Sequence, residues 1–131
     1  MIQNAQELQG ALHQFGSFLD MLEALRLQVE ETQNIAFFEH FARGPIAILA
    51  ERIDDIRACL QDPPPFLIAV PKLHADLRFF ACLAETLLAT HQWSMERGQF
   101  ALFSQSAAGL VLNLRAVAIE MHDIPAQKEA A

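Results

Sequence analysis

The sequence predicts an all-α protein, folded as an antiparallel up-down four-helix bundle, from two observations. First, apolar residues recur at alternating three- and four-residue intervals through most of the 131 residues, which is the pattern of helices that each bury one face. Second, the four periodic segments are similar in length and mostly short connections separate them, which favours antiparallel neighbours. The chain is 53 % hydrophobic, which is more than one core of this size requires.

The first helix is expected over residues 4–31. Asn4 is a suitable N-cap, and Glu7 three residues later resembles the second half of a capping box. The apolar stripe of this helix has an unbroken helical spacing and consists of Leu8, Ala11, Phe15, Phe18, Leu22, Leu25 and Val29.

The second helix carries a stripe from Ile35 to Leu60 that crosses Gly44-Pro45 without losing phase. Proline inside a helix removes a backbone hydrogen bond and clashes with the preceding turn. Either one helix is kinked there, or a short helix ends near Ala42 and a second begins with Pro45 as its first residue. The split is favoured, because glycine before proline suits a stop followed by a restart.

The run Asp62-Pro63-Pro64-Pro65 must end that helix, and the apolar segment 66–70 is expected to be extended and packed over the end of the bundle. Pro71 then opens the third helix, whose stripe runs from Leu73 to His91. Ser94 is expected to cap the fourth helix. Residues 1–123 are thus predicted to form one domain, and residues 124–131 a disordered C-terminal tail.

The stretch from Gly98 to Ile119 contains a single charged residue, Arg115, in 22 positions. Such a segment predicts a helix that is buried on most sides. Its polar residues favour burial against other helices over a membrane span. Arg115 is expected to be partly buried or to cross an interface, and therefore to need a carboxylate from another helix or another chain.

The formal charge of −7 argues against direct binding of nucleic acid, because such binding depends on Lys and Arg. Residues 1–62 hold ten acids and four bases, so the first half is expected to carry the acidic surface. The two cysteines, Cys59 and Cys82, lie in helical patterns and are expected to be buried, inert thiols of a cytoplasmic protein.

No pattern of catalytic, metal-binding or cofactor-binding residues is visible, and none is predicted. His91 ends an apolar stripe and is expected to lie at a helix C-terminus, where its protonated form would meet the negative end of the helix dipole. Apolar residues beyond the stripes, including Phe37, Phe41 and Phe79, leave a surplus that suggests self-association, most simply a homodimer.

The sequence therefore predicts a non-catalytic protein–protein interaction module, such as an adaptor, inhibitor or regulator, that acts through an acidic or apolar helix face. One alternative is a ligand-binding or enzymatic bundle with a cavity bounded by phenylalanines and Arg115 as its anion anchor. A further alternative is an acidic nucleic-acid mimic. The candidate residues for these roles are Arg115, His91, Phe37, Phe41, Phe79, Glu51, Asp54 and Asp55.

Overall fold

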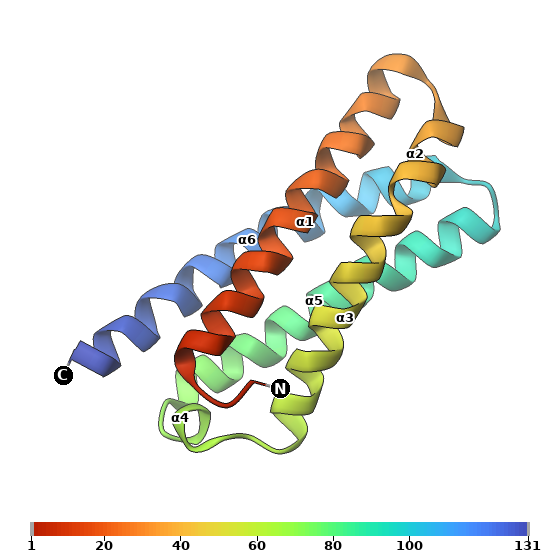
Figure 1. The fold of residues 1–131 in the computed structure, drawn as a ribbon. Helices are drawn as coiled ribbons and strands as arrows, with labels where there is room; N and C mark the ends of the chain where they lie inside the picture. The colour runs from red at the N-terminus through yellow and green to blue at the C-terminus, as the bar shows by residue number, and fades with distance from the viewer. Residues whose placement is uncertain (1, 131) are drawn as a thin grey trace.

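The computed structural model describes the backbone of residues 2–130 and the side chains of residues 2–122. The described residues form helices and no strand, so the all-α prediction is confirmed. Figure 1 shows six helices in the order α1 (Ala5–Thr32), α2 (Ile35–Phe41), α3 (Arg43–Gln61), α4 (Pro65–Ile68), α5 (Pro71–Glu96) and α6 (Phe100–Ala130).

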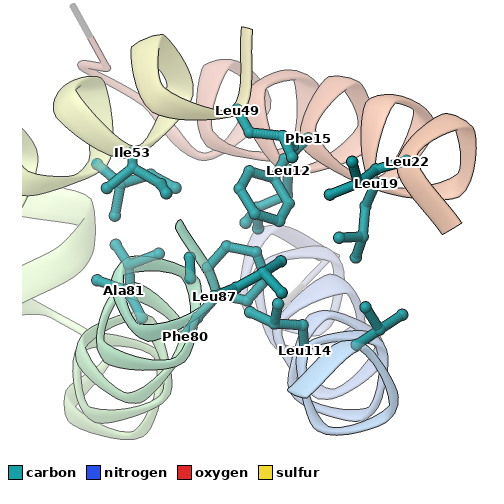
Figure 2. Close-up of a cluster of buried hydrophobic side chains, with 14 of the residues drawn as sticks. Leu12, Phe15, Leu19, Leu22, Leu49, Ile53, Phe80, Ala81, Leu87 and Leu114 are labelled. Atoms are coloured by element: carbon teal, nitrogen blue, oxygen red, sulfur yellow. The ribbon is translucent and has the colours of Figure 1, made fainter. Parts of the chain in front are cut away.

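The four long helices enclose the hydrophobic core. α1 lies beside α3 and α5 lies beside α6, and further contacts join α3 to α5 and α1 to α6 (Figure 1). Figure 2 shows side chains from all four helices meeting in the interior, among them Phe15 of α1, Leu49 of α3, Phe80 of α5 and Leu114 of α6. The rings of Phe15 and Phe80 meet edge to face, with centroids 5.0 Å apart.

The first helix begins and ends as predicted, to within a residue. The Asn4 side chain accepts a hydrogen bond from the backbone N–H of Glu7 at 2.8 Å, and the Glu7 carboxylate accepts one from the N–H of Gln3 at 3.1 Å. The buried stripe is rotated from the expected one, because Leu12 and Leu19 are buried where Ala11 and Phe18 are only half-buried.

The second predicted helix is split, as favoured, into α2 and α3. Ala42 separates them and still keeps a helical conformation, with φ −77° and ψ −16°. Its N–H donates to Phe38 at 2.8 Å and its carbonyl accepts from Ile46 at 2.9 Å. The new helix therefore begins at Arg43, two residues before the expected start, and Pro45 lies in its first turn, where a missing N–H costs little.

The connection after α3 differs from its prediction. Residues 65–68 form the short helix α4 and are not extended, because Pro65 has the φ angle that a helix start requires and the Pro64 carbonyl accepts hydrogen bonds from Leu67 and Ile68. The Leu67 side chain is fully buried and joins the core, so the expected packing of this connection is confirmed.

The predicted cap at Ser94 is wrong, since Ser94 is a buried residue inside α5. The helix ends instead at Glu96, and Gly98, two residues later, has a left-handed φ of 62°. The N–H of Gly98 donates to Met95 at 3.1 Å and that of Gln99 donates to Ser94 at 2.9 Å, which is a Schellman motif. Glycine takes this conformation without steric cost, and this is why the break falls there.

The expected disordered tail, residues 124–131, lies outside the residues whose side chains the structure describes, and it stays a prediction.

The prediction that both cysteines are buried is right for one of them and wrong for the other. Cys59 is buried, and burial raises the pKa of its thiol, whereas Cys82 is exposed on α5.

Candidate interaction face

The helix α6 is not buried on most sides, contrary to the sequence prediction. One side packs against α5 and α1 through residues that include Phe103, Ala107 and Leu114, while the opposite side is open. Leu112 and Ile119 are 68 % and 66 % exposed, the largest values among the large apolar side chains that the structure describes. The scarcity of charged residues in this helix predicts burial, but in the structure many of its uncharged residues lie on the surface.

We define the outer face of α6 as six exposed residues with alternating three- and four-residue spacing: Leu102, Gln105, Gly109, Leu112, Ala116 and Ile119. This spacing places them along one stripe of the helix. None of the six carries a charge, and at 1.5 Å per residue the stripe is about 26 Å long. Residues 100–122 are also long and apolar enough to cross a membrane by length and composition, a test that core helices of other proteins pass as well.

The edge of α6 next to α1 is anchored by a buried arginine that the sequence analysis missed. Arg26 is 6 % exposed, and its guanidinium holds the Glu23 carboxylate with two hydrogen bonds of 2.6 and 2.9 Å. Arg26 also donates to Glu30 at 3.3 Å and to the Ser104 hydroxyl of α6 at 3.0 Å. The hydrogen bonding of Arg26 to the Glu23 carboxylate, which accepts from the guanidinium, is the main cause of the raised pKa of Arg26.

The signal for this cluster was present in the sequence. Arg26 follows Leu22 by four residues and precedes Val29 by three, so it continues the apolar stripe, and Glu23 and Glu30 stand three and four residues from it. A base in a core position with acids at both helical neighbours indicates a buried ion pair.

Arg115 has the carboxylate partner that was expected, although it is not buried. Its Nη2 donates to Asp20 Oδ1 of α1 at 2.6 Å. The two side chains are 49 % and 66 % exposed, so water screens this pair.

A groove of about 510 Å³ separates α1 from α6 close to Arg115. Its lining is mostly apolar and includes Leu12, Ala118 and Ile119, with His13 and His122 at its edges. Neither Arg115 nor any phenylalanine belongs to this lining. The groove thus continues the apolar surface of the outer face, because Ile119 belongs to both.

His91 does not end a helix, since α5 continues to Glu96. Its imidazole lies among the rings of Phe38 and Phe103, with centroids 6.0 and 5.2 Å away. Burial lowers the pKa of His91, and the charge of Glu39 opposes this only in part. The expected dipole interaction is therefore wrong, and the imidazole is a core group that favours its neutral form.

The other aromatic candidates do not form a common site. Phe37 and Phe41 stack on each other on α2 with centroids 4.5 Å apart, and Phe41 is 51 % exposed. Phe79 is 54 % exposed on α5. The phenylalanines that gather are Phe38, Phe100 and Phe103, which are buried with ring centroids 4.9, 5.7 and 6.2 Å apart.

The acidic candidates on α3 lie close to a basic residue of the same helix, Arg52. Arg52 pairs with Glu51 at 3.4 Å and with Asp55 at 3.5 Å, and it also donates to Gln14 of α1. Asp54 is exposed beside them. Glu23 and Glu30 of α1 lie instead around Arg26, on the edge of α1 that faces α6.

Within residues 2–122, no three His, Cys, Asp or Glu side chains converge as metal ligands would. Comparisons with protein-family models, with curated proteins and with solved structures found no match to this chain. The interpretation of the outer face therefore depends on its own geometry and chemistry.

Proposed function

We propose that the protein is a non-catalytic protein–protein interaction module, an adaptor, inhibitor or regulator, whose contact surface is the outer face of α6. The observation that carries this proposal is the exposure of Leu112 and Ile119 on an uncharged helix face. Covering a large apolar side chain contributes about 1.5–3 kcal/mol, so a face of this kind favours association with another polypeptide.

We further propose that α1, α3, α5 and α6 form an antiparallel up-down four-helix bundle of the cytoplasm. Support comes from the contacts of α1 with α6. Arg26 meets Ser104 and Asp20 meets Arg115, so residue numbers rise along one helix as they fall along the other. Short connections at Gln33-Asn34, between α1 and α2, and around Gly98, between α5 and α6, agree with neighbours that alternate in direction.

The ligand-binding alternative has less support, because Arg115 is paired with Asp20 and lies outside the lining of the groove. Mimicry of nucleic acid also has less support, since Arg26 offsets acids on α1 and Arg52 offsets acids on α3. An interaction role needs neither feature.

A photo-crosslinking amino acid placed at position 112 tests the proposed function in living cells. We expect covalent adducts with a polypeptide, because the proposal places a partner against this residue. The matched control places the same group at Phe79, which is apolar and 54 % exposed on α5. Adducts that form equally from both positions, or from neither, would contradict the assignment of the contact surface to α6.

A further inference from the structure

The outer face of α6 has a pattern of side-chain sizes that is complementary to itself. If two copies of α6 pack antiparallel about a point midway between positions 110 and 111, Leu112 of one copy lies opposite Gly109 of the other. Ile119 then lies opposite Leu102. Ala116 lies opposite Gln105 in the same way. Two copies of this helix packed antiparallel would set the largest central side chain against a glycine, twice, with leucine against isoleucine at both ends.

We infer that the partner of the outer face is a second copy of this chain, packed antiparallel along α6 with a twofold axis between Leu110 and Val111. This inference rests on the proposed function, because it names the occupant of the same surface. A twofold contact uses one patch on both subunits, and a helix face whose side-chain sizes are complementary about one central point meets that requirement. The monomer itself does not need Gly109, since a Cβ there would meet no atom within 4 Å.

Charge also favours this face as the place where two copies meet. Each chain carries −7, so two molecules repel each other in most orientations. Residues 98–114 carry no charge, and in the antiparallel register Arg115 lies opposite Ser106 and Glu120 opposite Ala101. No like charges are therefore opposed along the seam.

The length of the seam predicts the strength of the dimer. A contact along about 26 Å of a single helix pair lies at the small end of specific interfaces, whose lower limit is about 1,200 Å² in total. We therefore expect a dimer that dissociates in the micromolar range. Lipid is a poorer occupant, because α6 also packs on α5 and would have to leave the core to cross a bilayer.

Sedimentation equilibrium of the full chain measures the dimer directly. We expect a reversible shift from 14.6 kDa toward twice that mass as the concentration rises. Leu112→Glu should weaken the dimer at least tenfold, and Leu112→Gln should weaken it less. Both variants should keep the wild-type circular dichroism, because Leu112 is exposed in the monomer. Phe79→Glu, the matched control, should leave the dissociation constant unchanged.

Cysteine cross-linking in a Cys82→Ser background tests the register. A mixture of one chain carrying Gln105→Cys and another carrying Ala116→Cys should form a disulfide-linked dimer, whereas either chain alone should not. A parallel dimer would instead link each of the two variants to a second copy of itself when it is present alone, and this result would overturn the inference.

A monomer at all concentrations would also overturn the inference. If position 112 still formed adducts with another protein in cells, the proposed function would survive that failure, and without such adducts both would fail. Flotation of the chain with phosphatidylcholine vesicles that is lost on Leu112→Glu would identify a lipid surface as the occupant and would likewise overturn the dimer.

Discussion

The phenyl ring of Phe103 on α6 meets the imidazole of His91 on α5 edge to face, with centroids 5.2 Å apart and planes inclined by 83°. Phe38 of α2 contacts both rings. This aromatic cluster joins three helices at one end of the core, and it contains a half-buried titratable group, the imidazole of His91. Its chemistry leads to two predictions.

The first concerns pH. Because burial holds the pKa of His91 below its ordinary value of 6.5, the unfolded chain takes up a proton before the folded protein does. The free energy of unfolding should therefore be greatest above pH 6.5 and should fall as pH decreases from there to the lower folded pKa. Urea unfolding between pH 7.5 and 5.5 measures this slope. His91→Leu should flatten it, while His40→Gln, an exposed control, should retain it.

The second concerns packing within the same cluster. Phe38 is fully buried, so Phe38→Ala should lower the free energy of unfolding by about 3–5 kcal/mol through lost burial and a residual cavity. Phe41 lies three residues away and is half exposed, so Phe41→Ala should cost less than about 1 kcal/mol. Chemical denaturation of both variants checks the contrast, and equal losses would contradict the placement of α2.

A third prediction concerns the buried arginine. Glu23→Ala removes the two strongest hydrogen bonds of Arg26 and should destabilise the protein by about 1.5–3 kcal/mol. The exposed Glu31→Ala on the same helix should change stability by less than about 0.5 kcal/mol. In the double variant Arg26→Met with Glu23→Ala, part of the loss should return, because the uncompensated charge is gone. A double variant less stable than Glu23→Ala would contradict this account.

A fourth prediction compares two glycines. Gly98 has a φ of 62°, so Gly98→Ala should cost about 1–2 kcal/mol because a Cβ is strained in that conformation. Gly10 lies inside α1, and a Cβ there would meet nothing within 4 Å. Gly10→Ala should therefore stabilise the protein by about 0.5–1 kcal/mol. Thermal unfolding of the two variants should shift in opposite directions.

The helical fold was predictable because the periodic spacing of apolar residues is a local property of the sequence. The start of α1 at Asn4 and the break near Pro45 follow from capping and from proline sterics, both of which involve neighbouring residues. The boundary between α5 and α6 was placed wrongly at Ser94, because Ser is a good cap in isolation. Only the left-handed conformation of Gly98 distinguishes the actual end.

The candidate site was less predictable, because exposure depends on which helices become neighbours. Low charge between Gly98 and Ile119 agrees equally well with burial and with an uncharged surface, and the sequence does not state how much of α6 its neighbours cover. The sequence also predicted the wrong exposure for Arg115 and for His91. The arginine expected to be buried is exposed, and the histidine expected at a helix end is enclosed by rings.

The contact of Arg26 with Ser104 also restricts how α1 can slide along its neighbour. An apolar stripe tolerates a shift of seven residues, since apolar residues then replace apolar ones, but such a shift would set the guanidinium opposite Val111 or Arg97 and away from the Ser104 hydroxyl. This contact and the pair of Asp20 with Arg115 thus select a single alignment of the two helices.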